Sequence, residues 1–381
     1  MILLRLLSFL LGFGLINFTI ASAVRTFVLP RAAPDFLTRT VFRISRRVFN
    51  FIIANIESYQ RRDGIMAFYA PIGLMILTPI WLSLIAIGYT GIFWGINGGA
   101  VYEAWLKSAS SLLTLGYAPP TSLIESVLIF LEAATGMIMV ALLIAYLPTI
   151  YSVFQRREAK VTAMAVRLGD PPSAVTLLMR SHLIMRLENL NGLWTSFTEW
   201  FEDLEESHTS LSATAFFRSP DPNRSWITTA GCMMDAAALA RSTLDIAPDP
   251  AADLMIRAGY LALRSIAKIY GFQIPDDPKF PDQHISITQA EFDAAYDQLA
   301  AAKVPLKQDR EQCWQDFAGW RVNYDSTLLD ICDLVMAPEA VWSADRSQGR
   351  WPLSPRFKTR NRLVSKEELY RESKEAELPN I

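Results

Sequence analysis

Three long runs of apolar residues constrain this chain more than any other feature. Residues 6 to 24 and 65 to 96 contain no charged side chain, and residues 121 to 154 contain only Glu125 and Glu132. A helix of about 20 apolar residues crosses the hydrocarbon core of a bilayer. The chain is 51% hydrophobic and only 19% charged, below the quarter that is usual in soluble domains. We therefore expect an all-α membrane protein with three transmembrane helices.

The first run could also be a signal peptide, because Ala21, Ser22 and Ala23 match a cleavage site. Eight arginines but only three acidic residues lie between this run and residue 65. Positive residues tend to stay on the cytoplasmic side. We therefore favour a retained span over residues 1–28, with its N-terminus outside, followed by a basic cytoplasmic linker over residues 29–64.

The linker contains a basic amphipathic stretch from Val41 to Ile56. Aromatic and aliphatic residues alternate there with three arginines. Such a helix can lie in the headgroup region of a membrane. It can equally be an ordinary helical connector, and the sequence leaves both interpretations open.

A short segment separates the second and third spans. After Gly98 and Gly99, residues from about Tyr102 to Leu113 predict a helix of roughly three turns, too short to cross a bilayer. The second span should bend at Pro71 and Pro79. Residues 97 to 122 contain a single lysine, which predicts that the segment enters the membrane from outside and returns there. Such re-entrant backbone must be covered by protein or water.

Residues 111 to 117 of this segment read Ser-Leu-Leu-Thr-Leu-Gly-Tyr. They resemble the pore helix and selectivity filter of the tetrameric potassium-channel superfamily, whose filter usually reads Thr-Val-Gly-Tyr-Gly. The resemblance covers residues 65–157, the pore module. It implies that the backbone carbonyls from Thr114 to Ala118 replace the hydration shell of a cation. The residues assigned to this filter are Thr114, Leu115, Gly116, Tyr117 and Ala118.

Ala118 departs from the pattern because it stands where the second glycine is usual. A β-carbon resists positive φ, so the outer end of this filter should differ from the usual one. The permeant ion is then K⁺ or Na⁺, and no bound cofactor is expected.

Two residues of the third span are further candidates. An ionisable group such as Glu132 is costly inside a membrane, so it should either support or line the pore, or serve as a helix-packing acid. Gly136 matches a hinge glycine of the family's inner helix, although small residues are also common in membrane helices.

Residues 158–343 predict an all-helical cytoplasmic domain. The inner helix should continue to Leu168 and stop at Gly169. Large apolar residues from Leu183 to Leu204 recur every three or four positions, which predicts one helical seam. Thr288 and Glu291 form a capping box, and Gln308 to Val335 predicts a single helix. Residues 344–381 predict a loose charged tail.

Other chemistry has little support. Net charge of −2 without a basic aromatic patch argues against nucleic acid, and three separated cysteines suit reduced thiols. No nucleophile or metal motif is present, so we expect neither an enzyme nor a metal site. Acidic residues from Glu199 to Glu206 with His208 could bind a divalent ion, although a solvated acidic face is the commoner explanation.

Together these observations predict a homotetrameric cation channel in the plasma membrane, in contact with lipid. One chain has one pore loop, so three further copies are required. The helical domain would regulate opening or assembly. The alternative is a membrane-anchored scaffold or sensor whose channel-like hairpin does not conduct.

Overall fold

The structure, a computed structural model, describes residues 2–29 and 35–346. Within these residues it contains helices and one isolated bridge between Leu244 and Leu306. The predicted tail lies outside the described residues apart from residues 344–346. The α-helices are α1 Ile2–Phe27, α2 Phe36–Ile53, α3 Tyr59–Met66, α4 Tyr69–Asn97, α5 Val101–Leu112, α6 Leu123–Leu168, α7 Ala174–Leu183, α8 Asn191–Ser210, α9 Trp226–Thr243, α10 Pro250–Ile269, α11 Gln289–Ala301, α12 Arg310–Arg321 and α13 Asp325–Val335.

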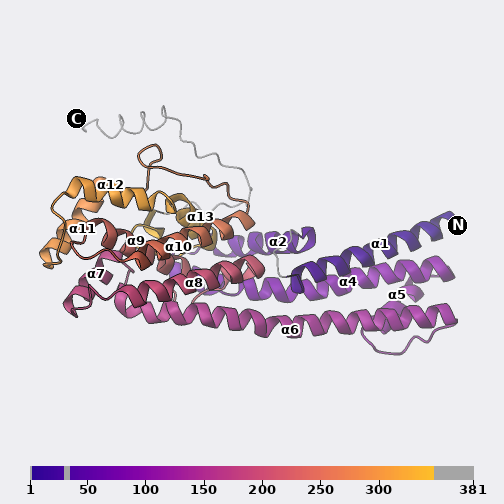
Figure 1. The fold of residues 1–381 in the computed structure, drawn as a ribbon. Helices are drawn as coiled ribbons and strands as arrows, with labels where there is room; N and C mark the ends of the chain where they lie inside the picture. Colours follow the sequence, from indigo (N-terminus) through magenta and orange to yellow (C-terminus); the bar gives the residue numbers. More distant parts are fainter. Residues whose placement is uncertain (1, 30–34, 347–381) are drawn as a thin grey trace.

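The molecule is elongated, with two different ends (Figure 1). Helices α1, α4, α5 and the first half of α6 form one end, which we call the apolar bundle. Helices α7 to α13 form the helical domain at the other end, where α7, α8 and α9 pack against one side of α6. Three segments are long and apolar enough to cross a membrane: Ile2–Phe27, Tyr59–Asn97 and Leu123–Leu168. The expected all-helical chain with three candidate spans is therefore confirmed.

Glycines allow α1 and α4 to approach closely. A β-carbon on Gly12 would lie 2.3 Å from the carbonyl oxygen of Gly88, and one on Gly95 would lie 2.8 Å from that of Arg5. Small residues at such crossings let two membrane helices pack backbone to backbone. The Arg5 guanidinium donates a hydrogen bond of 3.1 Å to the Gly95 carbonyl, where the negative end of the α4 dipole lies. The two helices therefore run antiparallel over most of their length.

Helix α2 runs along α4 in the opposite direction. Its N-cap Asp35 accepts a hydrogen bond of 2.7 Å from Ser22, whose hydroxyl also accepts one from Trp81 of α4. At its other end, Phe49 packs edge-on against Tyr69, the first residue of α4. Helix α2 therefore lies lengthwise beside the first turns of α4.

The helical domain is organised around α9. Nearly every residue of α9 is buried, which suits a helix that is surrounded by others. The predicted seam is wrong in its first third, because α7 ends at Leu183 and Met185 takes a φ of 53° before α8 begins at Asn191. The single helix predicted to end at Val335 is also wrong, because it breaks into α12 and α13.

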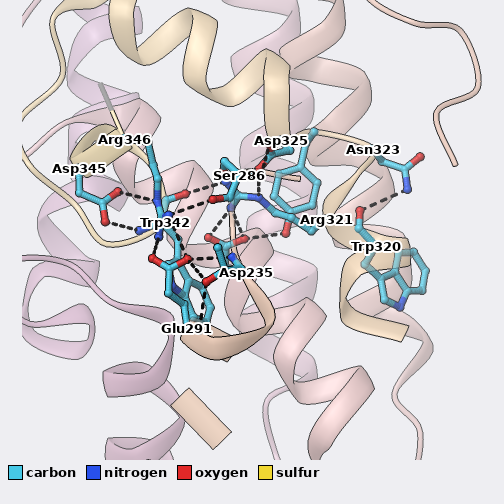
Figure 2. A network of polar contacts seen from close by, with 12 residues as sticks. Asp235, Ser286, Glu291, Trp320, Arg321, Asn323, Asp325, Trp342, Asp345 and Arg346 are labelled. Carbon is cyan, nitrogen blue, oxygen red and sulfur yellow. Dashed lines mark hydrogen bonds and ion pairs between the residues drawn. The ribbon is translucent and has the colours of Figure 1, made fainter. Parts of the chain in front are cut away.

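Buried charges hold this broken segment against α9 (Figure 2). The Arg321 guanidinium donates to both carboxylate oxygens of Asp235, at 2.6 and 2.8 Å, and to Asp325 at 2.8 Å. The hydroxyl of Tyr324 donates to Asp235 at 2.8 Å. Each charge is therefore compensated inside the domain, as buried charges must be.

Helix α6 passes from the bundle into the domain without interruption and ends, as predicted, before Gly169, where φ is 83°. Arg157 is buried at the junction. It pairs with Glu158 at 2.8 Å and donates to the carbonyls of Thr214 and Phe217 at 2.8 and 2.7 Å. Because these hydrogen bonds are charge-assisted, they fasten α6 firmly to the helical domain.

Candidate functional site

Helix α5 descends between α4 and α6 from the end of the bundle. The Ser108 hydroxyl donates to Glu132 of α6 and lies 3.0 Å from the Ala86 carbonyl of α4. Further along, the Leu112 carbonyl lies against Gly136 of α6. Gly136 is 13 residues beyond the start of α6, which corresponds to a depth of about 20 Å at 1.5 Å per residue. The end of α5 therefore lies well inside the bundle.

Gly136 serves this close approach. A β-carbon there would lie 2.4 Å from the Leu112 carbonyl oxygen, a separation that real β-carbons do not show. Helix α6 continues through the position without a break. The residue that resembles a hinge thus has a definite packing role: it admits the last turn of α5.

Glu132 is completely buried between α5 and α6. One carboxyl oxygen accepts the Ser108 hydrogen bond, and the other, Oε2, has no hydrogen-bond partner among the described residues. The structure therefore places Glu132 behind α5, hydrogen-bonded to it. A carboxyl in this position supports the short helix that leads into the filter-like loop.

Ser110 organises the filter-like loop, residues 113–118. Its carbonyl accepts from the Leu115 amide at 2.8 Å, and its hydroxyl accepts from the amides of Tyr117 and Ala118 at 3.0 and 3.2 Å. The sequence pattern did not identify Ser110, because the resemblance to the channel filter begins at Ser111. One serine thus fastens the returning loop to α5.

The loop backbone is unusual at two positions. Thr114 and Gly116 have φ of 55° and 74°, a region that glycine tolerates and a β-branched residue rarely adopts. The Leu115 and Tyr117 side chains are 59% and 54% exposed in the single chain. The loop therefore combines a strained backbone with apolar side chains that the chain itself leaves uncovered.

Glu125 forms a clasp at the mouth of the hairpin. Its buried carboxylate pairs with Lys107 of α5 at 2.8 Å and accepts from the Thr121 hydroxyl at 2.8 Å and from Asn97 at the end of α4. The lone lysine of residues 97–122 was the only sequence signal for this clasp. It joins the middle of α5 to the end of α4 and the start of α6.

One face of α6 is exposed over most of its length. Small residues on this face are separated by four or seven positions, so they lie within about 40° of one another around the helix axis. They are Ala141, Ala145, Ser152, Ala159 and Ala163, and all are exposed. The face extends from the bundle into the helical domain.

The acidic stretch of α8 does not form a metal site. His208 is buried, and its Nε2 atom lies 3.3 Å from the Arg157 guanidinium, while Nδ1 lies 3.0 Å from the Leu204 carbonyl. Burial, and secondly the charge of Arg157, lower the pKa of His208 well below 6.5. Within residues 2–29 and 35–346, no group of three histidine, cysteine or acidic side chains could hold a metal ion.

Comparison of the chain with protein-family models, with curated proteins and with solved structures finds no match. The arrangement of α5 and its loop therefore provides the main basis for a functional conclusion.

Proposed function

We propose that this chain forms a cation channel from four copies, with the filter-like loops around a common axis. The observation that carries the proposal is the hairpin of α4, α5 and α6. Helix α5 descends alongside Glu132 and Gly136, and the loop from Thr114 returns past Ser110 to the start of α6. This geometry suits a re-entrant pore segment, which the filter resemblance alone would not require.

The chemistry follows from the backbone. Carbonyl oxygens from Thr114 to Ala118 would replace the water around K⁺ or Na⁺. The C-terminal end of α5 leads into this loop, and the partial negative charge of a helix C-terminus attracts cations. Neighbouring copies would cover the exposed Leu115 and Tyr117 side chains. The exposed small face of α6 would line the axis below the filter.

In this proposal the helical domain lies in the cytoplasm, and the channel resides in the plasma membrane. Arg157 fastens the domain to α6, so a movement of the domain would displace the helix that lines the pore. Regulation of opening or assembly is the role that this connection supports.

The direct test is cation flux into liposomes that contain the purified full-length chain. We expect flux above that of empty vesicles and a stoichiometry of four in nanodiscs. Gly116→Ala should abolish flux, because alanine resists a φ of 74°. Gly14→Ala is a matched control, since a β-carbon at Gly14 meets nothing within 4 Å.

The same experiment separates the channel from the scaffold. The proposed pore would be contradicted if Gly116→Ala still conducted cations. A stoichiometry other than four or a multiple of four would contradict it too. A folded tetramer whose vesicles leak no more than empty ones would instead identify a non-conducting scaffold, which Ala118 and the prolines that follow it favour.

A further inference from the structure

We infer that the outer face of α2 binds an anionic phospholipid. The face consists of two parallel strips, one apolar and one basic, on the side of α2 that does not contact α4. This inference goes beyond the proposed function and does not depend on it. A channel and a scaffold with the same three spans would both bind the lipid.

The apolar strip lies exposed along the whole of α2. Phe36, Ile44, Val48 and Phe51 are 71%, 54%, 52% and 82% exposed. At 100° per residue, all four lie within about 120° of the helix circumference. The opposite face, which includes Val41 and other residues, is buried against the protein. An exposed apolar strip of this length is typical of a surface that contacts lipid or another protein.

The basic strip runs beside it and distinguishes between these partners. Arg39, Arg43 and Arg47 lie on successive turns, and none of their guanidinium groups has a hydrogen-bond or ion-pair partner among the described residues. By contrast, Arg46 faces the protein and donates to the Leu334 carbonyl at 3.0 Å. A guanidinium binds a phosphate group with two parallel hydrogen bonds. Three free guanidinium groups beside an apolar strip therefore match a phosphate headgroup and its acyl chains.

The position of α2 places both strips at one surface of the bilayer. Helix α4 has 29 residues, which span about 43 Å, more than the roughly 30 Å of a hydrocarbon core. Helix α2 runs beside the first part of α4, from the level of Trp81 to that of Tyr69. That part of α4 extends into the headgroup region when its other end lies at the opposite surface. The basic strip then meets the headgroups of the leaflet on the arginine-rich side.

The test uses the full-length chain in detergent with a dye on Val48→Cys. The native Cys232, Cys313 and Cys332 are buried, so the dye should label the new site selectively. Short-chain phosphatidylglycerol is titrated against short-chain phosphatidylcholine and inorganic phosphate. We expect phosphatidylglycerol to change the dye fluorescence at a concentration at least about tenfold lower than phosphatidylcholine does, since each arginine near anionic lipid contributes substantially.

Two triple variants give the decisive comparison. Arg39→Gln, Arg43→Gln and Arg47→Gln together should reduce the lipid preference to less than about twofold. The control triple, Arg167→Gln, Arg186→Gln and Arg257→Gln, removes the same charge from exposed positions of the helical domain and of the α6 end that packs against it. This control should keep the preference of the parent protein.

A further measurement keeps all the arginines, so its result does not depend on whether the arginine variants fold. Raising salt from about 0.05 to about 0.5 M should weaken the preference, because it screens exposed charges. Equal binding of the two lipids, a preference insensitive to salt, or equal loss in both triple variants would overturn the inference. A full response to inorganic phosphate alone at the same concentration would also overturn it, since it would identify a free-anion site.

Discussion

The apolar bundle and the helical domain differ in how two buried charged groups are paired, Glu132 and Arg321, and in how much apolar surface they leave exposed. In the domain, Asp235 and Arg321 satisfy each other and are almost inaccessible. In the bundle, Oε2 of Glu132 has no partner among the described residues, and only 17% of the most apolar window of α6 is buried. The Asp235–Arg321 pair is therefore enclosed by the domain, whereas much of the apolar surface of the bundle is left exposed by the single chain.

The largest effect should come from disrupting the buried charge network of the helical domain. Arg321→Met leaves Asp235 buried without its cation, which should cost about 3–5 kcal/mol of unfolding free energy. Asp235 and Asp325 outweigh burial and raise the pKa of Arg321 above its usual value, so the side chain is charged at any accessible pH. The measurement is chemical unfolding of the full-length chain in detergent.

Arg257→Met is the matched control, because Arg257 is exposed on α10. It should change the unfolding free energy by less than about 0.5 kcal/mol. If the two variants unfold at the same denaturant concentration, the charge network does not stabilise the domain.

The next effect concerns the contact between α5 and α6. Gly136→Ala introduces a β-carbon 2.4 Å from the Leu112 carbonyl oxygen and must displace α5. We expect a loss of about 1–3 kcal/mol in thermal unfolding in detergent. Gly14→Ala, in an open part of α1, should be neutral or slightly stabilising. Equal melting temperatures for both variants would show that α5 does not occupy its place beside α6.

A third effect probes the junction of the two regions through pH. Because the pKa of His208 in the folded chain lies well below 6.5, the unfolded chain binds a proton first as pH falls. The His208 contribution to stability is therefore complete above about pH 7 and falls below pH 6.5, by up to about 1.4 kcal/mol per pH unit. The measurement is the unfolding free energy between about pH 7 and pH 5.

His208→Gln should flatten this dependence, because glutamine can still accept from Arg157 but does not titrate. His284→Gln, at an exposed position, should leave it unchanged. A slope that survives in His208→Gln would assign the pH dependence to other groups.

The smallest effect on folding should come from Glu132 in the apolar bundle. Glu132→Gln keeps the shape and an oxygen acceptor for Ser108, so unfolding should change by about 1 kcal/mol or less. In the proposed channel it also removes an ionisable group from behind the filter, which should change cation flux or the stability of the tetramer. Unchanged flux together with unchanged assembly would leave Glu132 with a packing role alone.

The sequence predicted what depends on local pattern. Apolar length identified the three candidate spans, Gly169 marked the end of α6, and Thr288 with Glu291 forms the expected capping box. These features succeed because each is decided within a few residues or by total apolar length. Apolar periodicity and local capping hydrogen bonds decide them, and no distant partner is needed.

The errors arose where distant partners decide. Periodic apolar residues suggested a continuous helix through Met185, yet Leu187 and Leu190 are buried in a loop against the domain core. The chain breaks after Arg321, and Arg321 and Tyr324 on either side of the break both bind Asp235, 86 and 89 residues away. Periodicity cannot show such a requirement, because tertiary contacts override local helical preference.

In the candidate site, too, some residues were assigned from sequence and some contacts appear only in the structure. The assignment of Thr114 to Ala118 as a filter rests on their order alone and stays a prediction, and Gly136 was singled out by its place in the third span. The Ser110 and Glu125 contacts could not be assigned from sequence, since Glu125 binds groups from α4, α5 and the loop after it. Their geometry depends on how three segments meet.

The single rod of α6 has a mechanical consequence. From Gly136, beside α5, to Val161, inside the helical domain, the helix has no glycine and one proline, Pro148. About six turns of helix connect the anchored Arg157 to the contact with α5, with one backbone hydrogen bond missing at Pro148. A displacement of the helical domain would therefore be passed to the α5 contact by α6 itself, without an intermediate domain.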